Sequence, residues 1–173
     1  MDLVKNNYET INKCRISDSK ELVKVLDLGV QPLANSLKKK QFEDENKYPL
    51  TLSFCEKSSL LQLNETIKKE ILFNRYVWVT STSSTAKNYA QIFYKNIIKD
   101  IPLDKSNDLI IEIASNDGTF LKPFVSNGFK KAIGVDPAKN ISDIANKDNI
   151  KTINDYWNED LSKKISKQYG KAK

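Results

Sequence analysis

The chain has 173 residues, of which 39% are hydrophobic and 29% charged, and it carries a net charge of +6 at neutral pH. This composition is typical of a globular protein, and no run of about 18 apolar residues is present that could cross a membrane. Nearly all of the positive charge is lysine, since Arg15 and Arg75 are the only arginines. Arginine is the better reader of bases and phosphates, so the charge predicts a solvated surface and no nucleic-acid partner.

Residues 1–7 lack the apolar core of a signal peptide, which predicts a cytoplasmic protein. The two cysteines, Cys14 and Cys55, are too few for a disulfide framework. Histidine is absent. Any acid–base chemistry would therefore use aspartate, glutamate, tyrosine or lysine.

The first 70 residues are predicted to form a small β-rich module. Residues 22–29 are typical of a short strand that ends at a glycine turn, and residues 31–36 of a loop. Residues 48–55 and 60–63 alternate as the two strands of a hairpin should. A module of this size buries little apolar surface and often needs an additional cross-link.

Two short segments of this module have the outline of metal-binding knuckles. Cys14 is followed by Ser17, and Cys55 by Ser58, at the spacing of a Cys-x-x-Cys pair. Four thiolates at this spacing would predict zinc strongly, whereas a serine hydroxyl is a poor zinc ligand. Two interpretations stay open: a degenerate zinc site with Cys14 and Cys55 as its ligands, or two buried thiols without metal.

The pattern of the module resembles the N-terminal zinc-binding module of bacterial S-adenosylmethionine-dependent C-methyltransferases that act on nucleotide-linked deoxysugars. In that family both knuckles are Cys-x-x-Cys. The residues that carry the resemblance are Cys14-Arg15, Leu26-Asp27-Leu28-Gly29, Gln31-Pro32-Leu33-Ala34-Asn35, Tyr48-Pro49-Leu50, Cys55 and Leu61-Gln62-Leu63.

Residues 71–104 are predicted to be a connector that contains a long helix. The helix should run from residue 86 to about residue 99, after a run of hydroxyl residues suited to capping it. Tyr76 and Trp78 are explained most simply as packing residues. The resemblance implies a further role for this segment: Tyr76 becomes a candidate substrate-site residue, and Ser83 and Ser84 candidates near the cofactor.

Residues 105–173 alternate between strands and helices. Strands are predicted at residues 108–114, 131–135 and 150–153, with helices after each of them. This is the pattern of an α/β fold with a parallel sheet. We therefore expect an incomplete Rossmann-like sheet of the class I methyltransferase type, preceded by a small module like a zinc ribbon.

Polar residues at the predicted strand ends form the candidate cofactor site. Asp136 is placed to accept hydrogen bonds from ribose hydroxyls, and Asn154 and Asp155 to lie near an adenine edge. Asp117, expected at the start of a helix, would repel the pyrophosphate of NAD but could accept from the ammonium of a methionine moiety. This favours S-adenosylmethionine over NAD. The predicted cofactor-binding residues are Glu112, Ala114, Asn116, Asp117, Gly118, Asp136, Pro137, Asp155 and Ser84.

The segment from Glu112 to Thr119 resembles the Glu-x-Gly-Ser-Asn-Asp-Gly-Thr motif of the same family, with Ala114 in place of glycine. The resemblance implies a C-methyltransferase with a nucleotide-sugar substrate. In the family the proton chemistry belongs to the second half of the catalytic domain, so no catalytic residue is predicted in this chain. We expect a truncated or split N-terminal part, with a separately encoded C-terminal half as a possible partner. The alternative is a catalytically inactive cofactor-binding or structural partner protein.

Overall fold

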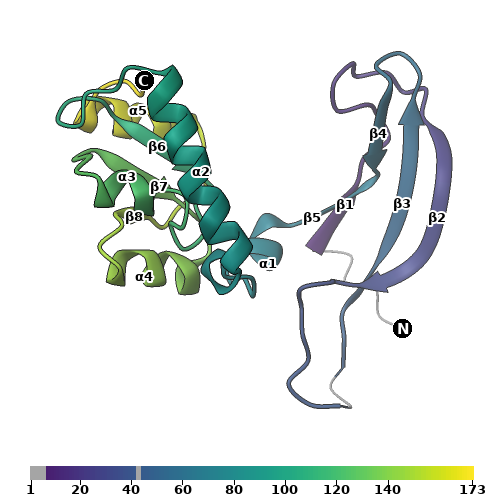
Figure 1. Ribbon diagram of the computed structural model, residues 1–173. Coiled ribbons are helices and arrows are strands. Elements are labelled where there is room, and N and C mark those ends of the chain that lie inside the picture. Colours follow the sequence, from purple (N-terminus) through teal and green to yellow (C-terminus); the bar gives the residue numbers. More distant parts are fainter. Residues whose placement is uncertain (1–6, 42–43) are drawn as a thin grey trace. The chain divides into compact units, whose positions relative to one another are not determined.

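The computed structural model describes residues 7–41 and 44–173 of the chain (Figure 1). Residues 1–6, on which the expectation about a signal peptide depended, lie outside the described part. The chain divides into two compact units, residues 1–72 and residues 73–173. Within the described ranges, no helix is both long and apolar enough to span a membrane.

The first unit is built from short antiparallel sheets. Strands β2, β3 and β4 form one sheet in that order, and β1 pairs with β5 in a second (Figure 1). The β3–β4 hairpin confirms the prediction, with Cys55 paired to Leu60 across the turn. The elements are β1 (Tyr8–Thr10), β2 (Val23–Pro32), β3 (Lys47–Cys55), β4 (Leu60–Leu63), β5 (Glu65–Ile67) and the short helix α1 (Lys69–Phe73).

Strand β2 continues through the glycine at which it was predicted to end. Gly29 takes a left-handed φ of 66°, and its amide donates to the Asp27 carboxylate at 2.9 Å. The register with β3 shifts between Asp27 and Val30, so the irregular residues are absorbed as a bulge. The prediction that the strand ends at Gly29 was therefore wrong, because a glycine in this conformation can interrupt a ladder without ending it. The predicted loop at residues 31–36 begins only after Pro32.

The second unit is a parallel sheet with helices on both faces. Its strands lie in the order β6-β7-β8, joined by α3 and α4. The elements are the 3-10 turn η2 (Thr80–Thr82), α2 (Ser84–Asp100), β6 (Ile110–Ile113), α3 (Lys122–Ser126), β7 (Ala132–Val135), α4 (Lys139–Lys147), β8 (Thr152–Ile153) and α5 (Glu159–Tyr169).

Two apolar clusters cover this sheet because side chains along β7 alternate between its faces. Ala132 faces a cluster with Tyr94 of α2, Phe124 of α3 and Ala145 of α4. Ile133 and Val135 belong to the other cluster, which includes residues of α5. The predicted α/β alternation is thus present, and it directs the carboxyl ends of the three strands toward one edge of the unit.

The chain also passes along the outer side of β6. The amide of Ile110 donates to Lys131 next to β7, whereas the carbonyl of Leu109 accepts from Lys173 at 3.1 Å. Neighbouring residues of a strand direct their backbone groups to opposite sides, so residues 172–173 lie on the side of β6 away from β7. Leu109 and Ala172 form a parallel bridge there.

Candidate functional site

The turn that follows β6 has an unusual backbone. Ala114, Asn116 and Gly118 take left-handed φ values of 57°, 52° and 74°. Asparagine tolerates this region and glycine adopts it freely, but alanine is strained there by about 1 kcal/mol. A Cβ at Gly118 would also come within 2.7 Å of an Ile150 side-chain carbon. The turn at the carboxyl end of β6 therefore has a backbone conformation that substitution at Gly118 would disturb.

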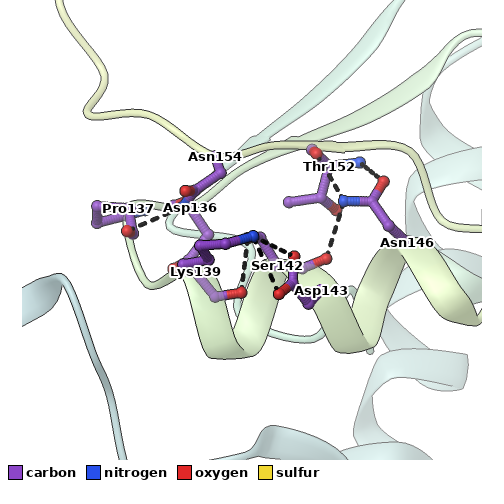
Figure 2. A network of polar contacts seen from close by, with 8 residues as sticks. All are labelled: Asp136, Pro137, Lys139, Ser142, Asp143, Asn146, Thr152 and Asn154. Carbon is purple, nitrogen blue, oxygen red and sulfur yellow. Dashed lines mark hydrogen bonds and ion pairs between the residues drawn. The ribbon is translucent and has the colours of Figure 1, made fainter.

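Asp136 joins this turn to the end of β7. One of its carboxylate oxygens accepts from the amide of Asn116 and the other from the amide of Ala138, each at 2.8 Å. The side-chain amide of Asn154, after β8, donates to the carbonyls of Asp136 and Pro137 at 3.0 and 2.9 Å (Figure 2). All three strand ends are consequently tied together by polar side chains. The sequence placed Asp136 and Asn154 at strand ends, but it did not predict that the Asn154 side chain bonds these two carbonyls.

A second set of contacts holds the segment before α2 against the same turn. The side-chain oxygen of Asn116 accepts from the amide and hydroxyl of Thr80 at 2.9 and 3.0 Å, and its amide donates to the carbonyl of Trp78 at 3.0 Å. The amide of Ser81 donates to Asp117 at 3.0 Å. Thr80 and Ser81 were not predicted as site residues; the hydroxyl run around them was the available signal.

Asp117 is buried and does not occupy the position in the fold that was expected. Helix α3 begins only at Lys122, so Asp117 does not stand at a helix entrance. Its other oxygen accepts from the hydroxyl of Thr119 at 2.7 Å. Burial opposes its ionisation, but the hydrogen bonds from Ser81 and Thr119 outweigh burial and hold the pKa of this carboxyl below its usual value. Asp117 is thus a stable anion.

Glu112 lies within β6 and is the least satisfied carboxyl of the site. Its Oε2 atom is buried without a hydrogen-bond partner among the described residues. Burial, followed by the charges of Asp117 and Asp136, raises its pKa to about 8. The side chain borders a cavity of about 440 Å³ whose other walls are mainly apolar residues of α2, β6 and α3. A cation beside these carboxyls would favour the ionised form of Glu112.

The remaining predicted residues lie at the periphery of this cluster. Asn140 of α4 bonds both the amide and the carbonyl of Tyr76, at 3.1 and 2.8 Å. The hydroxyl of Ser83 caps α2 through the amide of Ala86 at 3.2 Å, and Ser84 is exposed in the first turn of that helix. Asp155 is also exposed, and its carboxylate accepts from the neighbouring amide of Tyr156. No contact brings Ser84 or Asp155 to the bonded cluster of Asn116, Asp117 and Asp136.

In the first unit the two knuckle segments converge. The thiol of Cys14 is 3.1 Å from the hydroxyl of Ser58, and the hydroxyl of Ser17 is 3.5 Å from the thiol of Cys55. Both cysteines are fully buried. Hydrogen bonds from the hydroxyl and amide of Ser17 and from the Ser58 hydroxyl lower the pKa of the Cys14 thiol to about 6. We call Cys14, Ser17, Cys55 and Ser58 the knuckle quartet.

The donors of the knuckle quartet do not fit a structural zinc ion. Such sites use four thiolate, imidazole or carboxylate ligands. The quartet offers two thiols, and the described residues contain no group of three or more histidine, cysteine, aspartate or glutamate side chains that could hold a metal. The predicted positions are therefore brought together, but as a hydrogen-bonded cluster.

Comparison with known proteins agrees with the sequence pattern. Residues 14–73 match a methyltransferase family model described as "Putative zinc binding domain". Over 165 residues, or 94% of the chain, the sequence is 27% identical to the C-methyltransferase NovU of Streptomyces niveus. The match covers 39% of that relative, so the chain spans about two fifths of its length. The predicted resemblance is confirmed: over most of its length this chain is similar to a part of a C-methyltransferase.

Proposed function

We propose that the second unit binds S-adenosylmethionine at the carboxyl ends of β6 and β7, and that the chain is the cofactor-binding part of a C-methyltransferase acting on a nucleotide-linked deoxysugar. The observation that carries this proposal is the group of three carboxyls, Glu112, Asp117 and Asp136, around one strained turn. One of their oxygens is buried and unpartnered. The similarity to a C-methyltransferase supports the reaction class.

The charge of the site suits this cofactor. S-adenosylmethionine carries a sulfonium and an ammonium, and nearby carboxylates stabilise both. Glu112 has a free oxygen for such a group. Each oxygen of Asp136 accepts one amide and keeps a lone pair, so this carboxylate could still receive ribose hydroxyls. A dinucleotide pyrophosphate would meet only like charge here.

The topology supports the same location. Strands β7 and β8 continue the sheet on one side of β6, and residues 172–173 begin to extend it on the other. In doubly wound sheets, ligands bind outside the carboxyl ends of the strands where the strand order reverses. We infer that β6 is this reversal point and that the sheet is part of a Rossmann-like domain. The turn from Ala114 to Gly118 then lies in the crevice.

Bound S-adenosylmethionine would supply an electrophilic methyl group. The residues of this chain would orient it: Glu112 through the cationic groups, Asp136 through the ribose, and the segment near Tyr76 along the acceptor's side. Methyl transfer to carbon also needs a group that removes the acceptor's proton. We propose that this group comes from a C-terminal part of the enzyme, continuous with the chain or separately encoded.

Calorimetric titration of the full chain with S-adenosylmethionine tests the cofactor assignment. We expect saturable binding, weaker binding of the product S-adenosylhomocysteine, which lacks the sulfonium charge, and none of NADH. Glu112→Gln should weaken S-adenosylmethionine binding more than S-adenosylhomocysteine binding, while Glu159→Gln, an exposed change in α5, should leave both unchanged. Absence of binding at millimolar concentration would refute the assignment.

A further inference from the structure

We propose that the knuckle quartet stabilises the first unit without zinc, through thiol–hydroxyl hydrogen bonds, and that two serine side chains alone separate it from a working zinc site. This proposal concerns the first unit and does not depend on the cofactor assignment. It departs from the zinc-binding description of the matched family.

The knuckle quartet joins two distant segments of the chain. Each thiol pairs with the hydroxyl of the opposite knuckle, so the Cys14–Ser58 and Ser17–Cys55 contacts cross between segments about 40 residues apart. The amides of Ile16 and Ser17 both donate to the Cys14 thiol at 3.4 Å. Four side chains from two segments thus meet at one partly buried place, with two amides directed at the Cys14 sulfur. This is the arrangement that a tetrahedral ion would need.

The chemistry of the donors decides against an ion. Ser17 and Ser58 carry neutral hydroxyls, which are hydrogen-bonding groups near neutral pH. Two thiolates would give zinc half of its usual ligands. The quartet satisfies its own polar atoms by hydrogen bonding, which removes the need for a metal.

A neighbouring residue provides a second connection between the same segments. Gln62 of β4 is buried, and its side chain accepts from the amide of Arg15 and donates to the carbonyl of Lys13, both at 3.0 Å. The guanidinium of Arg15 donates to the carbonyl of Leu63 at 3.1 Å and to the hydroxyl of Thr66 at 2.7 Å. These contacts hold the first knuckle on β4 and its neighbourhood, and none of them needs a metal.

The test compares metal content and melting of the full chain and its variants. Wild-type protein, purified with zinc present and then dialysed, should hold far less than one zinc per chain, and a chelator should not change its melting temperature. Ser17→Cys with Ser58→Cys should bind about one zinc per chain. Its melting temperature should rise with zinc and fall with chelator. Cobalt should give this variant the absorption of tetrahedral thiolate coordination.

The matched control adds two cysteines elsewhere in the unit. Ser36→Cys with Ser59→Cys places them at exposed positions outside the quartet and should gain no zinc. Stoichiometric zinc in the wild-type chain, or a drop in its melting temperature with chelator, would overturn the proposal. Failure of the folded Ser17→Cys, Ser58→Cys protein to bind zinc would also overturn it. If that variant does not fold, the wild-type measurement decides alone.

Discussion

The two units are stabilised in different ways. In the second unit, apolar clusters cover both faces of a parallel sheet, and polar side chains join the strand ends. In the first unit, β2 is exposed along its whole length, including Val23, Val25 and Leu28, and the buried residues include Cys14, Ser53 and Gln62. The second unit therefore depends on apolar packing, and the first on a few buried polar connections.

This difference shows that the arrangement of a motif can persist when the side chains needed for its usual chemistry are absent. The knuckle segments keep their convergence although half of the expected ligands are hydroxyls, because hydrogen bonds occupy the place of metal bonds. The carboxyl cluster of the second unit differs in this respect. All of the expected carboxyl side chains are present there, but most of their oxygens accept hydrogen bonds from backbone amides of the protein itself.

The largest expected effect would break the packing of the second unit. A Cβ at Gly134 of β7 would lie 2.4 Å from the Ser115 hydroxyl and 2.8 Å from that of Thr152. Gly134→Val should therefore lower the free energy of unfolding by about 3 kcal/mol or more. Trp78 and Trp157, the two tryptophans of the chain, both belong to this unit, so denaturant unfolding followed by their fluorescence reports it.

The corresponding control separates steric conflict from a general intolerance of substitution. Gly134→Ala should be milder than the valine variant, and adding Ser115→Ala should recover part of the loss because it removes the closest atom. An unchanged fluorescence midpoint for Gly134→Val would show that β7 does not approach its neighbours this closely.

The second prediction concerns the pH dependence of the second unit. The pKa of Glu112 is about 8 in the folded chain, against 4.5 as its ordinary value. The folded state therefore binds more protons than the unfolded state between these values, and stability should fall as pH rises from about 4.5 to 8. We expect a fall of up to about 5 kcal/mol, measured by denaturant midpoints at each pH.

Glu112→Gln removes the titrating group and should flatten this part of the profile. The variant should equal the wild type near pH 5 and exceed it near pH 8.5. A wild-type stability that rises over the same interval would contradict the assigned burial of this carboxyl.

The third prediction sharpens the description of the first unit. Gln62→Ala leaves the amide of Arg15 and the carbonyl of Lys13 without partners, which should cost about 1–2 kcal/mol. Hydrogen exchange read by mass spectrometry should show faster exchange in β4 and the first knuckle. Exchange in β6 and β7 should be unaffected by this change. As a control, Gln31→Ala at an exposed position should not change exchange in either unit by a comparable amount.

The smallest effect is expected at the strained turn. Ala114→Gly removes a left-handed alanine and should raise stability by up to about 1 kcal/mol. Ala138→Gly, at an ordinary φ of −77°, should instead lower it. Thermal melting of both variants measures the contrast, and equal shifts in one direction would argue against strain at Ala114.

Much of the second unit could be predicted from its sequence because its signals are local. The spacing of apolar residues indicated α2, and the apolar runs indicated β6 and β7. The functions of Asp117 and Asp136 could not be predicted in full, since their hydrogen bonds to Ser81 and Asn116 depend on loops that meet only in the fold. Asn154 could be placed at a strand end, but its bonds to the carbonyls of Asp136 and Pro137 could not be predicted, because an asparagine after a strand has many possible partners.

The first unit was harder to predict beyond its hairpin. Strands β1 and β5 have three residues each and pair across more than 50 positions, so neither has a local signature. The bulge at Gly29 also has no periodic signal. The resemblance led us to expect that the two knuckles converge. It did not predict that hydrogen bonds, and not metal bonds, join them, because replacing a cysteine by a serine changes the chemistry of the side chain but not its spacing in the sequence.

The contacts of Tyr76 have a consequence for the dynamics of the candidate site. The side chain of Asn140 bonds both the backbone amide and the backbone carbonyl of Tyr76, as a neighbouring strand would. A few residues later, the side chain of Asn116 bonds Trp78 and Thr80. Residues 76–81 are thus fastened at both ends to the second unit. They form a fixed rim and not a hinged lid, so the entry of a small molecule past them would be limited by diffusion and desolvation, with no loop closure to time it.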